Sequence, residues 1–142
     1  YIHGAAFGLQ RRQLRGGGLV VPTVHNAHRL SLSELMSQLR AVLERARNAQ
    51  LRSSDLADST LSVSHLGDLG AESVQGVIYP PQVALVGLGR VVLRPTVVNG
   101  QVVAARTLHA SLAGDHRVSD GLVGSRFLAA LTARLKTLEP GS

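Results

Sequence analysis

His116 is the residue whose type and setting best suit chemistry, because it stands where an apolar, strand-like run stops and an amphipathic helix pattern begins. A histidine just outside a helix N-terminus faces the positive end of the helix dipole, which disfavours imidazolium and favours the neutral ring. A neutral imidazole accepts a proton near pH 7, as a general base must. A lone histidine in a turn is also a common surface or hydrogen-bonded residue, so the residues alone leave both interpretations open.

Two elements must position this histidine. Upstream, residues 107–113 alternate polar and apolar side chains, which predicts a half-buried strand. Downstream, residues 120–138 repeat apolar side chains at helical spacing, which predicts a core-facing helix. Ser119 or Asp120 can cap that helix, and Pro140 follows its far end. The apolar positions of this helix are Val123, Phe127, Ala130, Leu131, Leu135 and Leu138.

A second helix is predicted over residues 32–49. Ser31 and Glu34 have the spacing of a capping box. An apolar stripe that includes Met36 predicts that one face lies in the core, while Arg40, Glu44, Arg45 and Arg47 lie on a solvated face. The stripe consists of Leu32, Leu35, Met36, Leu39, Val42, Leu43 and Ala46.

The remaining segments indicate short strands joined by turns. Proline at 80 and 81 precedes an apolar run typical of a buried strand, and Asn99-Gly100 is typical of a hairpin turn. The predicted strands are 1–7, 19–24, 59–67, the apolar run that follows Pro81 up to residue 89, 91–98 and 101–105, with a basic glycine-rich loop at 8–18 and a polar connector at 53–58.

The composition narrows the classes of function. The chain has 142 residues, of which 44% are hydrophobic, so it suits one globular domain. The absence of cysteine excludes disulfides and thiolate metal sites and favours an intracellular protein. The net charge of +6 comes with only two Phe, two Tyr and no Trp, which argues against nucleic-acid binding. We also expect no membrane span, and no metal, because His25 and His28 lack a third ligand.

The segment His-Arg-Val-Ser-Asp-Gly at 116–121 resembles the His-x-x-x-Asp-Gly signature of the dihydrolipoyl acyltransferases, the core components of 2-oxoacid dehydrogenase complexes. Three further blocks, at 18–32, 60–67 and 79–89, resemble segments of that family in the same order. The resemblance implies an α+β fold, the two-layer mixed sheet with packed helices of chloramphenicol acetyltransferase. It also implies that residues 1–142 are the C-terminal part of the catalytic domain, with its N-terminal part missing and no lipoyl or peripheral-subunit-binding domain.

The resemblance implies acyl transfer between coenzyme A and dihydrolipoyl thiols, with acetyl, succinyl and branched-chain groups all open. His116 would remove the thiol proton, Ser64 would donate a hydrogen bond to the oxyanion, and Asp120 would support the turn through an ion pair with an arginine. His65 stands where the family usually has Asn. Ser64 and His116 are 52 positions apart, so they can meet only through tertiary or quaternary structure. In the family they meet across a subunit boundary.

The resemblance further implies a homotrimer, which can build a larger cubic or dodecahedral core, and the decarboxylase and dihydrolipoamide dehydrogenase components as partners. Coenzyme A would be a substrate whose binding residues the sequence does not identify. The lipoyl group would sit on a domain outside this chain, since the single lysine, Lys136, has no lipoylation motif. The protein would be cytoplasmic in a bacterium or in the mitochondrial matrix of a eukaryote. The alternatives are a non-catalytic oligomerisation scaffold of the same fold, a basic nucleic-acid binder, and an acyltransferase that acts on a free acceptor.

Overall fold

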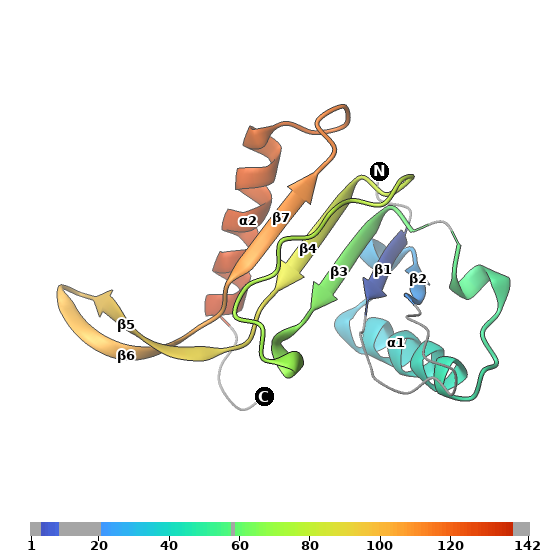
Figure 1. Ribbon diagram of the computed structural model, residues 1–142, viewed down its shortest axis with the longest axis horizontal. Helices are drawn as coiled ribbons and strands as arrows, with labels where there is room; N and C mark the ends of the chain where they lie inside the picture. The colour runs from blue at the N-terminus through green and yellow to red at the C-terminus, as the bar shows by residue number, and fades with distance from the viewer. Residues whose placement is uncertain (1–3, 9–20, 58, 138–142) are drawn as a thin grey trace.

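The computed structural model describes residues 4–8, 21–57 and 59–137, and its centre is a five-stranded mixed sheet (Figure 1). The strand order is β2-β1-β3-β4-β7, and a separate hairpin is formed by β5 and β6. The strands are β1 (Gly4–Gly8), β2 (Thr23–His25), β3 (Leu61–His65), β4 (Ala84–Leu88), β5 (Val92–Val98), β6 (Gln101–Thr107) and β7 (Ala110–Gly114).

The direction of the strands decides which loops share an end of the sheet. Strands β1, β3 and β4 are parallel, whereas β7 is antiparallel to β4. Gly114 at the end of β7 is therefore level with Ala84 and Leu61, at the beginnings of β4 and β3. The end of β3 and the end of β7 lie at opposite ends of the sheet.

Both predicted helices are present. Helix α1 (Leu32–Arg47) begins with the predicted capping box, in which the Glu34 carboxylate accepts from the Ser31 amide at 2.7 Å and the Ser31 hydroxyl accepts from the Glu34 amide at 3.3 Å. Helix α2 (Gly121–Lys136) is capped by Asp120, whose carboxylate accepts from the Val123 amide at 2.9 Å. Both helices begin and end within two residues of the predicted limits, as expected when capping residues define the boundaries.

The prediction that the helix stripes lie in a core holds only in part, since Leu35, Leu39, Leu43 and Ala46 of α1 are half-buried. In α1 only Val42 is buried, while Met36 is 39% exposed and Leu32 is 73% exposed. In α2 no residue is buried, and Val123, Phe127 and Leu135 are all exposed. An apolar stripe indicates that a helix face is to be covered, but it does not say that the cover comes from the same chain.

Arg45 does not lie on a purely solvated face as predicted. Its guanidinium donates to both carboxylate oxygens of Asp55, at 2.6 and 2.9 Å, and the Arg52 amide donates to the same carboxylate at 3.0 Å. The hydrogen bonds from Arg45 lower the pKa of Asp55 to about 2. This contact joins α1 to the short 3-10 helix η2 (Ser53–Asp55), which lies in the predicted connector.

The predicted hairpin is confirmed. Asn99 and Gly100 both have positive φ, 51° and 79°, which matches the right-handed twist of the flanking strands. The hairpin extends away from the sheet (Figure 1), and its Leu93, Val97 and Val102 side chains are more than two-thirds exposed. Strand β7 starts at Ala110 instead of residue 107, because Thr107 completes the ladder of β6. Of the predicted 8–18 loop, residues 9–18 lie outside the described residues.

The faces of the sheet differ in what covers them. Gly124 of α2 approaches Leu112, so the helix covers the face that Leu112 shares by register with Val86 and Val63. The opposite face of β4 is crossed by residues 71–78, whose Val74 lies against Gly87. Within the described ranges, no helix is long and apolar enough to cross a membrane.

Candidate functional site

The turn between β7 and α2 presents His116. The Asp115 amide donates to the Val83 carbonyl at 2.8 Å, which joins the start of the turn to the strand beside it. The Asp115 carbonyl accepts from the amides of Val118 and Ser119 at 2.9 and 3.0 Å, so the chain reverses tightly around His116. The His116 side chain is exposed and makes no hydrogen bond or ion pair with any other described residue.

Asp115 is a residue of this turn that the sequence analysis did not single out. Its carboxylate accepts from the Arg117 amide at 3.0 Å and from the Arg117 guanidinium at 2.7 to 3.2 Å. The hydrogen bonds from Arg117 lower the pKa of Asp115 to about 2, so the carboxylate is charged at neutral pH. The signal in the sequence was the spacing, since an aspartate commonly accepts from the amide two residues further on.

Asp120 contacts the helix that follows it. Its carboxylate caps α2, as predicted for one of two candidates, and Ser119 does not share that role. Over residues 21–57 and 59–137, Asp120 forms no ion pair with an arginine, and the turn's ion pair joins Asp115 to Arg117 instead. Within one chain Asp120 therefore sets where α2 begins, four residues after His116.

Ser64 lies near the end of β3, between two parallel neighbours. Its register partners are Gly8 on β1 and Gly87 on β4, and Gly87 pairs in turn with Ser111 on β7. The side chain is half-buried, and its hydroxyl makes no hydrogen bond within the described part of the chain. A hydroxyl in this state is free to donate to a bound molecule.

One chain does not bring its own His116 to its own Ser64. Ser64 lies three residues along β3 from the row that contains Gly114, and β3 is two strand spacings from β7, with β4 between them. With strand spacings of about 4.8 Å and a rise of about 3.3 Å per residue, the Cα atoms of Ser64 and Gly114 are roughly 14 Å apart. His116 lies further out in the turn, so a contact between the two side chains requires two chains.

Close backbone contacts surround the Ser64 end of the sheet. A Cβ on Gly89 would lie 1.9 Å from the Glu72 carbonyl oxygen, and a Cβ on Gly87 would lie 2.7 Å from the Val74 carbonyl oxygen. Ser111 also donates a hydrogen bond to the Val74 carbonyl. Glycine is therefore required where residues 71–78 cross β4, and this crossing covers the face that Ser64 shares with Gly87 and Ser111.

His65 lies beside Ser64 in sequence but on the other face of β3, because side chains alternate along a strand. Its Nε2 atom lies over Gly67, 2.8 Å from where a Cβ would be, and the Cα atom of Arg90 lies equally close. His65, which stands where the family usually has Asn, therefore does not share a face of the sheet with Ser64 within one chain. The ring instead packs over the glycine turn that follows β3.

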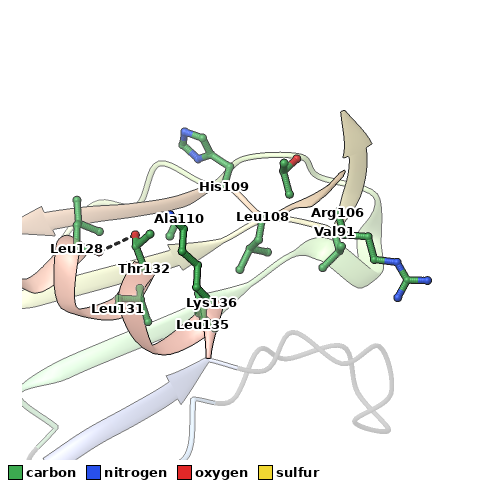
Figure 2. A pocket seen from close by; sticks show the side chains of 11 residues that line it. Val91, Arg106, Leu108, His109, Ala110, Leu128, Leu131, Thr132, Leu135 and Lys136 are labelled. Carbon is green, nitrogen blue, oxygen red and sulfur yellow. Dashed lines mark hydrogen bonds between the residues drawn. The ribbon is translucent and has the colours of Figure 1, made fainter. Parts of the chain in front are cut away.

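A cavity of about 630 Å³ lies between the second half of α2 and the connection from β6 to β7 (Figure 2). Leucines 108, 128, 131 and 135 line it, and Arg106, His109 and Lys136 add positive or ionisable groups. Neither His116 nor Ser64 lines this cavity. Among the described residues, no group of His, Asp or Glu side chains is placed to hold a metal ion, and His25 instead hydrogen-bonds the Ser54 carbonyl at 2.7 Å.

Comparisons with known proteins identify the family. Residues 13–140 match the catalytic domain of the 2-oxoacid dehydrogenase acyltransferases, and the chain belongs to that family. It is 37% identical over 107 residues to the dihydrolipoyllysine-residue acetyltransferase component of the pyruvate dehydrogenase complex of Staphylococcus epidermidis, which is 75% of this chain and 25% of that protein. It is 33% identical over 127 residues to the mitochondrial lipoamide acyltransferase component of the branched-chain alpha-keto acid dehydrogenase complex of Caenorhabditis elegans, which is 89% of this chain and 28% of that one. The chain thus spans about a quarter of the length of these relatives.

Solved structures of the same family confirm the predicted fold, a mixed sheet with packed helices. The probable dihydrolipoamide acetyltransferase of Listeria monocytogenes matches with a TM-score of 0.86 and 25% identity, over 98% of this chain and 58% of that one. The Azotobacter vinelandii dihydrolipoamide acetyltransferase, studied for the role of a serine, a histidine and an asparagine in catalysis, matches with a TM-score of 0.78 and 26% identity, over 92% and 52% of the two chains. The cubic core of the pyruvate dehydrogenase multienzyme complex matches with a TM-score of 0.77 and 26% identity, over 90% and 51%.

Proposed function

We propose that this chain is the C-terminal portion of an acyltransferase catalytic domain that moves an acyl group between the thiols of coenzyme A and a dihydrolipoyl group. One observation carries the proposal above the others. In the Azotobacter protein the serine stands 52 positions before the histidine and the asparagine stands four after it. Ser64, His116 and Asp120 have the same spacing, with aspartate in the third position.

His116 is the general base of the proposed reaction. A free thiol is mostly protonated at pH 7, so an exposed imidazole without an intrachain partner takes its proton. The thiolate attacks the thioester carbonyl, and the Ser64 hydroxyl donates a hydrogen bond to the oxyanion, a contact worth about 3 kcal/mol of barrier. Collapse of the tetrahedral intermediate expels the second thiolate, which takes the proton back from the imidazolium.

The active site lies between two chains in this proposal. The register separates His116 from Ser64 within one chain, so His116 of one chain faces Ser64 of its neighbour. The exposed apolar side chains of α2 and of the β5–β6 hairpin support an assembled state, because monomers rarely expose so many of them. We propose a homotrimer within a larger core that works with the decarboxylase and dihydrolipoamide dehydrogenase components of the complex.

The acetyl group is the proposed acyl group, because the acetyltransferase relative has the higher identity. A branched-chain acyl group is the second candidate, since that relative matches over a larger share of this chain. The lipoyl group belongs on another domain, and coenzyme A is bound as a substrate. The location follows the source organism, the cytoplasm of a bacterium or the mitochondrial matrix of a eukaryote.

The test is an acyl-transfer assay on the full-length, assembled protein with dihydrolipoamide and either acetyl or isobutyryl coenzyme A. We expect turnover, and a loss of about 10² to 10⁴-fold in kcat for His116→Ala, the range of a general base. His109→Ala is the matched control, since His109 is also exposed and lies at the other end of β7. An assembled wild-type protein without turnover, or a fully active His116→Ala variant, contradicts the proposal and favours a scaffold.

A further inference from the structure

All polar atoms of Asp115 are engaged in holding the turn that carries His116. The amide donates to Val83, and the carbonyl accepts from Val118 and Ser119. The two carboxylate oxygens accept from the amide and the guanidinium of Arg117. The Asp115 side chain is only 17% exposed, although that of Arg117 is 85% exposed. One residue thus connects Val83, which precedes strand β4, to the turn and the flanking arginine.

The length of the side chain matters for this arrangement. A carboxylate bonded directly to Cβ reaches the amide two residues further on, and its second oxygen remains free for the guanidinium. Asparagine keeps one acceptor oxygen but cannot make the charged pair. Alanine keeps only the backbone bonds to Val83, Val118 and Ser119.

The turn has two consequences for the residue between Asp115 and Arg117. His116 has no side-chain partner within the described residues. The backbone of the turn therefore sets the position and direction from which its ring extends. The Arg117 guanidinium is neutralised by Asp115, so no unpaired positive charge stands beside the imidazolium that forms during proton transfer. Both effects act on the proton-transfer step, which follows the binding of substrate.

We propose that Asp115 is a positioning residue for the general base, which acts through Arg117 and the turn to hold His116 in its reactive orientation. This inference rests on the proposed function. The family resemblance implied that Asp120 supports the turn through an ion pair with an arginine. In this proposal Asp115 has that role, through its ion pair with Arg117.

The experiment compares Asp115→Ala, Asp115→Asn and Arg117→Ala in the full-length, assembled protein. For Asp115→Ala we expect kcat to fall about 10- to 100-fold, because a small misplacement of a catalytic group can cost two orders of magnitude. The KM values for both thiol substrates stay within about two-fold, since the residue does not bind substrate. Arg117→Ala keeps the hydrogen bond from the backbone amide of residue 117 to the Asp115 carboxylate, so its kcat should fall less. Asp115→Asn keeps one acceptor oxygen, so its kcat should lie between that of Asp115→Ala and that of wild type.

Two controls separate positioning from folding. Glu34→Ala removes an exposed carboxylate that accepts hydrogen bonds from Ser31 at the start of α1, outside both parts of the proposed site, and should leave kcat unchanged. In the double variant Asp115→Ala/Arg117→Ala, kcat should be no lower than in Asp115→Ala, because both residues act as one unit. Additive losses, or a kcat loss matched by an equal rise in both KM values, overturn the inference.

The outcomes also distinguish this inference from the proposed function. If His116→Ala abolishes turnover while Asp115→Ala keeps the wild-type kcat, only the positioning role fails. If His116→Ala retains turnover, the proposed function fails. If Asp115→Ala does not assemble, Arg117→Ala and Asp115→Asn decide the question, and wild-type kcat in both overturns the inference.

Discussion

The two ends of the five-stranded sheet hold the two proposed catalytic groups in different ways. Ser64 is part of a strand, with ladder partners on both sides and the backbone of residues 71–78 crossing the same face on β4. His116 lies outside the ladder, in an exposed turn held by the bonds of Asp115 and followed by the cap of Asp120. A strand position is set by many backbone bonds, whereas a turn position depends on a few side chains. The two ends should therefore respond differently to substitution and to pH.

The largest expected effect tests whether the two ends meet between chains. Ser64→Ala should lower kcat about 10² to 10³-fold, the cost of losing one oxyanion donor. When Ser64→Ala and His116→Ala chains are co-expressed, about a quarter of the seams in a randomly mixed ring pair an intact serine with an intact histidine. Activity should rise well above that of either variant alone.

The control for this experiment mixes the two purified homo-oligomers under conditions in which chains do not exchange. Activity should stay at the level of the variants. If co-expressed chains also stay inactive while assembling normally, the shared-site geometry is wrong, and the serine and histidine act within one chain or not together.

The second effect is on the free energy of unfolding. It contrasts the packing at the Ser64 end of the sheet with that at the His116 end. Gly89→Ala places a Cβ against the backbone of Glu72, which cannot move as a flexible side chain would. We expect a loss of about 1 to 3 kcal/mol in the free energy of unfolding, the usual cost of overpacking. Gly121→Ala, at the His116 end, meets nothing within 4 Å and should be neutral or stabilising by up to about 1 kcal/mol.

Urea unfolding of the assembled protein at fixed concentration measures both variants. Equal stability of Gly89→Ala and Gly121→Ala would contradict the contrast. It would mean that residues 71–78 do not lie against β4 as closely as described.

The smallest expected effect is the acid response of the His116 turn. The pKa of Asp115 is lowered from 3.8 to about 2 by its bonds to Arg117. A carboxylate with a lowered pKa in the folded state stabilises that state above its ordinary pKa, and the contribution is lost as pH falls from about 4 to about 2. Wild type should therefore be more stable than Asp115→Asn above pH 5, and the difference should shrink across that window.

Asp55→Asn is the comparison, since Arg45 lowers the pKa of Asp55 to about the same value. That pair is far less exposed than Asp115 and Arg117, so solvent screens it less and its removal should matter more. Urea midpoints measured from pH 2 to pH 7 give the difference in stability between wild type and each of the two variants, Asp115→Asn and Asp55→Asn. A difference for Asp115→Asn that grows on acidification would contradict the assigned ion pair.

Local sequence signals predicted most elements, because the signals are local in origin. The capping box at Ser31 and Glu34, the cap at Asp120 and the Asn99-Gly100 turn each depend on residues within four positions of one another. The exact start of β7 could not be predicted, since Thr107 suits a strand equally well in β6 or β7 and only the ladder decides. The Asp115–Arg117 pair had a local signal that the family resemblance, by drawing attention to Asp120, obscured.

Burial was the property that the sequence described least well. The stripe containing Met36 and the stripe containing Phe127 have the spacing of core faces, yet both residues are 39% exposed. Periodicity reports that a face is apolar, whereas the partner of that face is a property of the whole assembly. The same limit applies to the cavity beside α2, whose lining comes from Val91 and from two further segments, 106–110 and 128–136.

The sequence by itself determined the positions of the helices and the hairpin turn, because each depends on neighbours along the chain. His116 was a candidate from its place between strand and helix, and the family resemblance added Ser64 and Asp120. Only the tertiary structure decided that β7 runs antiparallel to β3 and β4, and hence that His116 and Ser64 stand at opposite ends of one sheet. The reason is physical. Strand order and direction follow from contacts between distant segments, and those contacts leave no periodic mark in the sequence.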